Sequence, residues 1–253
     1  MVVVTERDVA SFRRFEGPRC VVVGIDDVLP RSVWALPRVQ MRINLRRPVP
    51  PLRGWILQQL VKLAIAEQAH ERVVVMVDSD LVFVRPVTVD TFAPGGRIRL
   101  YRKENGVDSS MSRHMRWHVV ARKLLGLPAA QPPPLPDYVS GLNSWDRDVV
   151  KRMLRRIEHV TGRRWLEAVG KELHFSEQIL YGVHADEVER ASNLTPTCDS
   201  LCHEYYSNIP LTAQRAPAWL SSLGSHDVAY MISSKSHTPL SVRRAAHADV
   251  FAS

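Results

Sequence analysis

The chain has 253 residues and a formal net charge of +8, and 45% of its residues are hydrophobic. This composition is that of a globular protein that can bury a sizeable core, in one large domain or two small ones. No stretch approaches about 18 consecutive apolar residues, which argues against a membrane-spanning helix. The N-terminal segment becomes charged after a few apolar residues and does not resemble a signal peptide, so we expect a cytoplasmic protein.

Most of the 34 basic residues are arginines, and they are scattered along the chain. The charge is compatible with an anionic partner, such as a nucleotide, but an arginine-rich composition explains it equally. No basic motif is interleaved with aromatic residues, so we expect no nucleic-acid partner. Three cysteines indicate reduced thiols, and the spacing of Cys198, Cys202 and His203 is loose for a zinc site.

In chain order, the first part of the sequence alternates predicted strands and helices. A short N-terminal strand, MVVVT, precedes the helix-like DVASFRRF, and a second strand leads into Asp26 and Asp27. Residues 51–68 have apolar side chains at helical spacing, and a third strand at residues 73–77 also ends in two acids. This alternation is typical of an α/β fold with a mostly parallel sheet, in which ligands bind at the C-terminal ends of the strands.

The second part begins with a basic amphipathic helix at residues 109–125. A proline-rich connector at residues 128–137 cannot be helical. The segment YVSGLNSW predicts a strand, and a long helix follows at residues 147–160. Another helix begins after Ser176, a favourable N-cap, and the tail predicts a strand, a loop and a last helix.

The acids that follow the third strand, Asp78 and Asp80, are the most informative residues of the chain. An unpaired buried charge costs several kcal/mol, so two carboxylates at the end of an apolar strand call for a cation. Carboxylate oxygens suit hard divalent ions such as Mg²⁺ and Mn²⁺, which in turn bind diphosphates. The alternative is a strand-end turn in which Asp78 caps the backbone and Asp80 faces solvent.

Three enzyme classes have a strand that ends in Asp-x-Asp. Glycosyltransferases of the nucleotide-sugar type use the acids to hold a metal ion on the donor diphosphate. Phosphatases with an aspartyl nucleophile place the motif after the first strand of the core, whereas here it follows the third. Nucleotidyltransferases that make nucleotide sugars open with a glycine-rich phosphate loop, but this chain opens with TERD, starting at Thr5. The first class therefore fits best.

The order of four sequence blocks supports that class: GWILQQLVKL, VVMVDSDLVFVRPV, YVSGLNSWDRDVV and HFSEQILYG. They span about residues 50–205. The chain thereby resembles GT-A glycosyltransferases of the retaining glycogenin and galactosyltransferase type, together with small bacterial relatives. The resemblance implies an α/β fold of the GT-A type, with a mostly parallel central sheet flanked by helices, in a single domain. Residues 1–100 would bind the nucleotide, and residues 101–253 would complete the sites for donor sugar and acceptor.

The resemblance also implies a set of site residues. Glu177 and Gln178 begin the helix that borders donor and acceptor, and they are the candidate catalytic residues, although the helix dipole alone would favour an acid at Glu177. The candidate donor-binding residues lie at strand ends and in the four blocks: Thr5, Asp26, Asp27, Gln59, Lys62, Asp78, Ser79, Gly141, Asn143 and Lys235. For Asp26 and Asp27, a simple turn is an equally good explanation.

In enzymes of this type a late histidine supplies the third protein ligand of the metal. His203 or His237 would take that place beside Asp78 and Asp80. We therefore expect Mn²⁺ or Mg²⁺, a nucleotide-sugar donor that is a UDP-sugar by resemblance, and an acceptor that is a small molecule, a glycan or a lipid-linked compound. Two alternatives stay open. One is a metal-dependent phosphohydrolase with Asp78 as nucleophile, and the other is a non-catalytic module that binds a nucleotide sugar.

Overall fold

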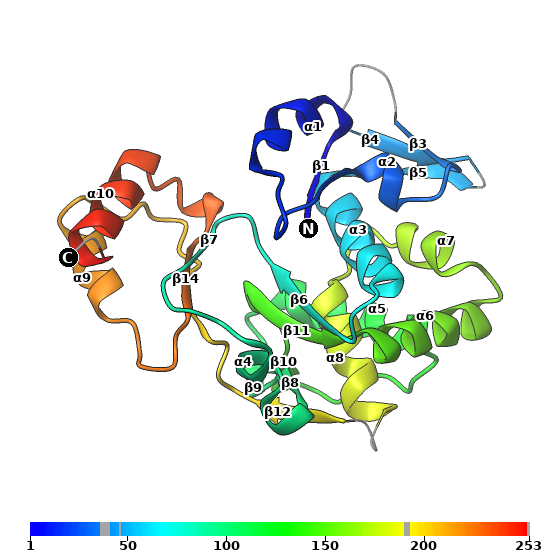
Figure 1. Cartoon of the computed structure of the whole chain (residues 1–253). Coiled ribbons are helices and arrows are strands. Elements are labelled where there is room, and N and C mark those ends of the chain that lie inside the picture. Colours follow the sequence, from blue (N-terminus) through cyan, green and yellow to red (C-terminus); the bar gives the residue numbers. More distant parts are fainter. Residues whose placement is uncertain (36–40, 46, 190–192, 252–253) are drawn as a thin grey trace. The chain divides into compact units, whose positions relative to one another are not determined.

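The computed structural model describes residues 1–35, 41–45, 47–189 and 193–251. Within these ranges the chain has a mixed α/β fold, as predicted (Figure 1). It forms two compact units, each assembled from three segments. The first unit comprises Met1–Arg72, Val107–Leu135 and Arg147–Arg190, and the second comprises Val73–Gly106, Pro136–Asp146 and Ala191–Ser253. Each unit therefore draws on both of the predicted functional halves.

The first unit is mainly helical. Its elements are β1 (Val2–Val4), α1 (Glu6–Phe12), η1 (Arg13–Phe15), β2 (Val22–Gly24), α2 (Ile25–Val28), β3 (Val33–Ala35), β4 (Met41–Asn44), β5 (Arg47–Arg53), α3 (Gly54–Gln68), α5 (Ser112–Leu125), α6 (Arg147–Thr161), α7 (Trp165–Gly170) and α8 (Glu177–Glu187). The four predicted helices of this part are confirmed as α3, α5, α6 and α8. Ser176 caps α8 as predicted, because its hydroxyl accepts a hydrogen bond from the Ile179 N–H.

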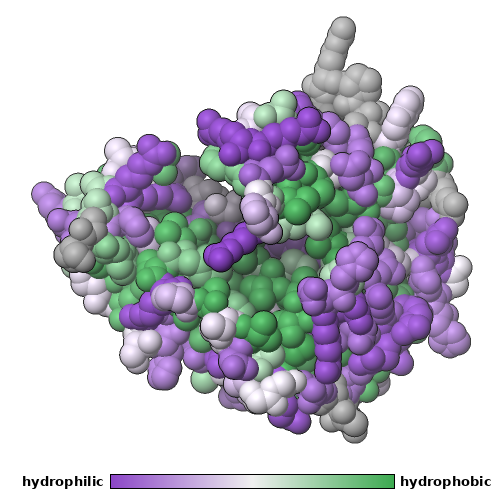
Figure 2. All heavy atoms as spheres, in the orientation of Figure 1, coloured by the Kyte–Doolittle hydropathy of each residue, from purple (hydrophilic) through white to green (hydrophobic). Residues whose placement is uncertain are grey.

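The long helices of the first unit form because their apolar side chains share one face. The buried side chains of α6 recur every three or four residues: Val149, Val150, Met153, Leu154 and Ile157. Figure 2 shows hydrophilic residues over the region that Figure 1 labels α6, which is the solvent-facing side of this helix. On α3, Leu60 and Leu63 are fully buried, and α3 packs against α6, α7 and α8.

The strands of the first unit form two small sheets. β1 and β2 run parallel, with Val2 opposite Val22, which confirms the two predicted N-terminal strands. β3, β4 and β5 form an antiparallel sheet. The acids Asp26 and Asp27 lie in α2, the single helical turn that follows β2 directly.

The second unit contains most of the strands. Its elements are β6 (Val73–Val77), β7 (Leu81–Phe83), α4 (Val89–Phe92), η2 (Pro94–Gly96), β8 (Ile98–Tyr101), β9 (Lys103–Val107), β10 (Leu135–Asp137), β11 (Leu142–Asp146), β12 (Leu194–Thr197), β13 (Cys202–Tyr205), α9 (Arg215–Ser221), β14 (Ala229–Ile232), η3 (Ser234–Ser236) and α10 (Leu240–Phe251). The predicted strand at residues 73–77 is β6. The predicted last strand, loop and helix are β14, η3 and α10.

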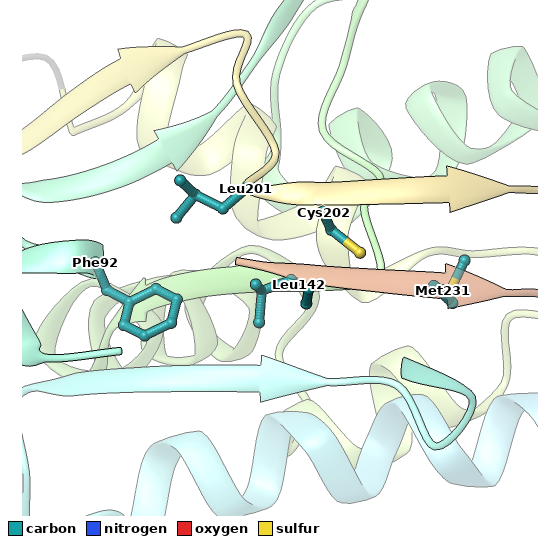
Figure 3. Close-up of a cluster of buried hydrophobic side chains, with 6 residues drawn as sticks. Phe92, Leu142, Leu201, Cys202 and Met231 are labelled. Carbon is teal, nitrogen blue, oxygen red and sulfur yellow. The ribbon is translucent and has the colours of Figure 1, made fainter. Parts of the chain in front are cut away.

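Strands far apart in the sequence pair in the second unit. β6 pairs with β11 in antiparallel register, from Val77 opposite Leu142 to Val73 opposite Asp146. β7 pairs antiparallel with β14, which runs parallel to β13 on its other side. β8 and β12 run parallel, and β9 pairs with β10. A core cluster of Phe92, Leu142, Leu201, Cys202, Ala229 and Met231 packs between these elements (Figure 3).

The described strands do not form the central, mostly parallel sheet that the sequence predicts. They form small sheets of two or three strands, and most of the pairs with a described register are antiparallel. The alternation of strands and helices along the chain led to the prediction, because a helix between two strands favours a parallel crossover. The partner of β6, however, is β11, which is 65 or more residues away in sequence and runs in the opposite direction.

No helix in the described part of the chain is long and apolar enough to cross a membrane.

Candidate functional site

The two acids that motivated the metal prediction lie where the chain leaves one small sheet and enters another. We call Asp78, Ser79 and Asp80 the acid turn. It connects β6, which pairs with β11, to β7, which pairs with β14. The Asp78 N–H donates to the Gly141 carbonyl at 3.0 Å, and the Leu81 N–H donates to the Asp78 carbonyl at 3.2 Å. These backbone bonds end β6 and close the turn, so both carboxylates belong to one short, tethered segment.

Asp80 is bound by a second loop of the same unit. The backbone N–H of Ser234 donates to Asp80 Oδ2 at 2.7 Å. Ser234 begins η3, and the segment continues through Lys235 to His237, whose backbone has a left-handed φ of 55°. The structure thus brings the loop of Lys235 and His237, both predicted site residues, to the acid turn. Both side chains are exposed.

Gly141 lies beside the acid turn, as the sequence prediction requires. The close packing around it explains why this residue is a glycine. A side-chain methyl group at this position would lie 2.6 Å from Met231 Sδ and 3.3 Å from Glu204 Oε1. Only glycine fits this close approach without moving its neighbours. Asn143, two residues on, is buried, and its side-chain amide donates to the Ser140 carbonyl at 3.0 Å. That amide is used locally in the described structure.

A carboxylate that the sequence prediction missed, Glu204, is part of the same site. Glu204 Oε1 accepts a short hydrogen bond from the Gly141 N–H and a bond of 3.0 Å from the Ser140 hydroxyl. Burial raises the pKa of Glu204 to about 7, and repulsion by Asp78 adds to the rise, while hydrogen bonds from Gly141, Ser140 and Tyr206 lower it. The same glycine therefore contacts Asp78 through its carbonyl and Glu204 through its N–H.

Glu204 could have been found only weakly from the sequence. It lies in the segment LCHEYY, between His203 and two tyrosines, and the neighbouring histidine is the more familiar metal ligand. Successive residues of a strand point to opposite sides, so in β13 Cys202 and Glu204 share one side and His203 takes the other. Cys202 is part of the core cluster that contains Leu142, which places Glu204 on the side of the acid turn.

The His203 side chain contacts α9 and the residue that follows this helix. Its ring stacks on Trp219 with the centroids 4.4 Å apart, and its Nε2 lies 3.2 Å from the Ser222 hydroxyl. Within the described ranges, no group of three or more His, Cys, Asp or Glu side chains is placed to hold a metal ion. The predicted third ligand, His203 or His237, is therefore not assembled with the two acids, and its identity stays a prediction.

The donor set of the acid turn still fits a hard divalent ion. Mg²⁺ commonly keeps several waters and binds through one or two protein carboxylates plus substrate phosphates, without a complete protein cage. Asp78 and Asp80 provide two carboxylates on one tethered turn, and Ser79 between them is exposed. These oxygen donors suit Mg²⁺ or Mn²⁺ better than they suit softer metals.

In the first unit, three predicted residues from two distant blocks meet. The Glu177 N–H donates to Gln59 Oε1 at 2.9 Å, and Lys62 Nζ lies 3.1 Å from Glu177 Oε1. The side chains of Lys62 and Glu177 are only 15% and 5% exposed, so this is a buried ion pair. Gln178 is buried as well. The carboxylate proposed for catalysis is therefore compensated by a lysine inside the first unit.

The first unit also has a pocket where β1 and β2 end. Its volume is about 450 Å³, and its lining residues are Val3, Thr5, Glu6, Arg7, Ile25, Met41, Arg42, Gly54, Leu57, Gln58 and Val61. Thr5, a predicted donor contact, borders it. The Arg42 guanidinium is buried at the pocket wall and forms an ion pair of 2.6 Å with the Glu6 carboxylate. It forms a second, closer ion pair with the Asp26 carboxylate.

The two acids after β2 have different roles in this pocket region. Asp26 fixes Arg42 and so shapes the pocket wall. Asp27 accepts a hydrogen bond of 3.2 Å from the Gly24 N–H, a local cap of the turn α2. For Asp27 this contact matches the simple turn that the sequence left open.

Comparison with known proteins gives one result. A protein-family model, described as a family of unknown function (DUF6492), matches residues 1–222. A search of curated proteins finds no match.

Proposed function

The chain belongs to the DUF6492 family, and we propose that it is a metal-dependent glycosyltransferase that moves a sugar from a nucleotide-diphosphate donor to an acceptor. The observation that carries the proposal is the acid turn. Two carboxylates, from Asp78 and Asp80, follow a strand at the point where the chain passes between two sheets, and two separate loops tether them. Two carboxylates on one tethered turn offer the oxygen ligands that Mg²⁺ and Mn²⁺ prefer.

The proposal assigns metal binding to the second unit. Asp78 and Asp80 would hold Mn²⁺ or Mg²⁺, and the bound ion would neutralise the charge that develops on the leaving diphosphate. The Ser234 N–H orients the Asp80 carboxylate, and the Gly141 carbonyl holds the backbone of Asp78. Lys235 lies in the loop that contacts Asp80, where a cation would favour a diphosphate.

The pocket of the first unit is a separate candidate small-molecule site. Its volume of about 450 Å³ is within the usual range of small-molecule sites. Its wall combines apolar side chains, Val3, Ile25 and Leu57, with the polar Thr5 and Gln58. Such a mixture suits a small molecule that has both apolar surface and hydroxyl groups in need of hydrogen-bonding partners. A UDP-sugar donor, retention of configuration and a GT-A arrangement of the fold belong to the proposal through the sequence resemblance.

Calorimetric titration tests the proposal directly. UDP, GDP and ADP are titrated with and without Mn²⁺ into the wild type, into Asp80→Asn and into a control, Asp249→Asn, which changes an exposed acid of α10. We expect one nucleotide to bind in a metal-dependent way, and Asp80→Asn to weaken that binding at least about tenfold while Asp249→Asn does not. If no nucleotide binds with any metal, the glycosyltransferase proposal is wrong.

Two further readouts separate the alternatives. An aspartyl phosphohydrolase would release phosphate without an acceptor and would form a phosphorylated Asp78. A non-catalytic module would bind the nucleotide but would not consume the nucleotide sugar with any acceptor.

A further inference from the structure

A groove of the second unit begins at the acid turn and runs between the sheet and the last helix. Its volume is about 410 Å³. The lining residues come from the acid turn, β7, β14 and α10: Ser79, Asp80, Leu81, Val82, Tyr230, Ile232, Leu240, Arg243, Arg244 and His247. All of them lie within the second unit, so the groove is complete in that unit.

The strand register explains why the acid turn opens into this groove. Val82 of β7 lies opposite Tyr230 of β14, so the two side chains share a face of the sheet. Ile232, two residues further along β14, projects to the same face because side chains alternate along a strand. This is the face on which α10 packs through the buried Ala246. Asp80 directly precedes β7 and lines the groove beside it.

The helix side of the groove is basic. Arg243 donates to three backbone carbonyls, those of Thr238 at 3.0 Å, Ile232 at 2.7 Å and Ser233 at 3.3 Å. These acceptors fix the guanidinium but are neutral, so within the described part of the chain no carboxylate pairs with it. Burial raises the pKa of Tyr230, and the charge of Arg243 opposes that rise.

Two more basic side chains line the groove further along α10. Arg244 is exposed and makes no hydrogen bond or ion pair with another described residue. His247 Nδ1 lies 3.2 Å from the Tyr230 hydroxyl, which places the imidazole over the Val82 end of the groove. The lining thus has three basic side chains against one acid, Asp80, and that acid lies at the end next to the proposed metal.

The floor and the outer lip of the groove are apolar. Val82 and Ile232 come from the two strands, and Leu240 from the first turn of α10. Leu240 is 59% exposed and Val82 is 38% exposed, which leaves apolar surface that a ligand could cover. The groove therefore offers positive charge and apolar surface side by side.

We propose that this groove binds the acceptor, and that the acceptor carries a phosphate group next to an apolar group. This inference rests on the proposed glycosyltransferase function. The phosphate would lie against Arg244 and His247, because its three acceptor oxygens can accept from a guanidinium and from an imidazole N–H. The apolar group would cover Val82 and Leu240. A hydroxyl of such an acceptor would then lie toward Asp80, where the donor is proposed to bind.

Calorimetry with simple phosphates tests the groove in the absence of nucleotide and metal. The probes are butyl, hexyl and octyl phosphate, inorganic phosphate and the neutral hexyl glucoside, titrated into the full chain below the concentration at which they form micelles. We expect hexyl phosphate to bind at least about tenfold more tightly than inorganic phosphate or hexyl glucoside. Equal binding of hexyl phosphate and inorganic phosphate would overturn the apolar part of the proposal, and equal binding of hexyl glucoside would overturn the phosphate part.

Variants locate the binding. Arg244→Gln should weaken hexyl phosphate about tenfold, and the control Arg155→Gln, at an exposed arginine of α6, should not. Leu240→Ser should weaken hexyl phosphate about fivefold without changing the binding of inorganic phosphate. Both positions are exposed, so these variants are expected to fold. Hexyl phosphate that binds equally to the wild type and to both variants lies elsewhere, and the groove is then not its site.

The chain-length series distinguishes two sources of the same chemistry. Affinity that keeps rising from butyl to octyl phosphate supports a lipid-linked acceptor, and affinity that levels off at butyl phosphate supports a compact phosphorylated molecule. If no alkyl phosphate binds, the proposal is wrong. Because nucleotide and metal are absent from these titrations, the groove and the donor site can each fail without the other.

Discussion

Glu177 of the first unit and Glu204 of the second both lie beside predicted site residues, and their surroundings are opposite. In the first unit, Glu177 is buried next to Lys62, with 3.1 Å between Oε1 and Nζ. In the second unit, Glu204 is held by the neutral donors of Gly141 and Ser140, and burial raises its pKa to about 7. Within the described ranges it has no ion pair. Glu177 is thus a charge compensated by a lysine, whereas Glu204 is a group that can exchange a proton near neutral pH.

Position in a motif therefore does not decide which carboxylate is available for chemistry. Glu177 occupies the position that the family resemblance favours, yet its charge is used inside the protein. Glu204 lies outside the quoted motifs, yet it shares Gly141 with the acid turn. The ion pair of Lys62 and Glu177 and the single acid Glu204, which has neutral partners, respond differently when their partners are changed.

The largest effect is expected from Lys62→Met. This change leaves the buried Glu177 without its cation, and breaking a buried ion pair from one side costs about 3–5 kcal/mol of unfolding free energy. Urea unfolding at pH 7 measures the loss. The control is Lys123→Met, because Lys123 pairs with Glu172 at 2.9 Å but is 59% exposed, and such surface pairs contribute less than about 1 kcal/mol.

A double variant sharpens this test. Lys62→Met combined with Glu177→Gln removes the uncompensated charge and should recover part of the lost stability. If Lys62→Met costs no more than Lys123→Met, the pair of Lys62 and Glu177 does not stabilise the first unit.

A smaller effect is expected from Gly141→Ala in the second unit. The added methyl group would lie 2.6 Å from Met231 Sδ, so the thioether and the neighbouring strand must move. Such overpacking costs about 1–3 kcal/mol of unfolding free energy. Urea unfolding again measures it, with Gly17→Ala as the control, because a methyl group at Gly17 would meet no described atom within 4 Å. Equal stability of the two variants would contradict the packing reason given for Gly141.

The smallest effect is a change in pH dependence caused by Glu204→Gln. The pKa of Glu204 rises from 4.5 to about 7 on folding, so between these values the folded state binds more protons than the unfolded state. The contribution of this group is therefore present at low pH and is lost as the pH rises through about 7. The slope is below about 1.4 kcal/mol per pH unit, because Glu204 is only partly buried.

In Glu204→Gln that slope is absent, so the variant should gain stability relative to the wild type as the pH is raised from 4.5 to 7. Urea unfolding across this range measures the difference, with Glu71→Gln at an exposed position as the control. Parallel stability curves for the wild type and Glu204→Gln would show that the environment of Glu204 does not shift its titration.

Much of the local structure was predictable from the residues. The helices α3, α5, α6 and α8, the cap at Ser176 and the strand β6 all follow from side-chain periodicity and capping, which depend on neighbours a few positions away. The acid turn was predictable for the same reason, because an apolar strand that ends in two acids has to turn there. Its loop contacts with Gly141 and Ser234 were only partly predictable, since nothing near Asp80 in the sequence identifies Ser234 as its partner.

The rest depends on contacts between distant segments. The residues alone predicted β1, β2, β6, β11 and β14, the long helices, and the position of Asp78 and Asp80 after an apolar strand. They also predicted that a helix begins at Glu177. Three features became visible only in the folded chain. β6 runs antiparallel to β11, Lys62 compensates the charge of Glu177, and Glu204 lies beside the acid turn. The physical reason is that periodicity is a property of neighbours along the chain. The burial and partners of a charge are instead set by side chains that the fold brings together from far along the chain.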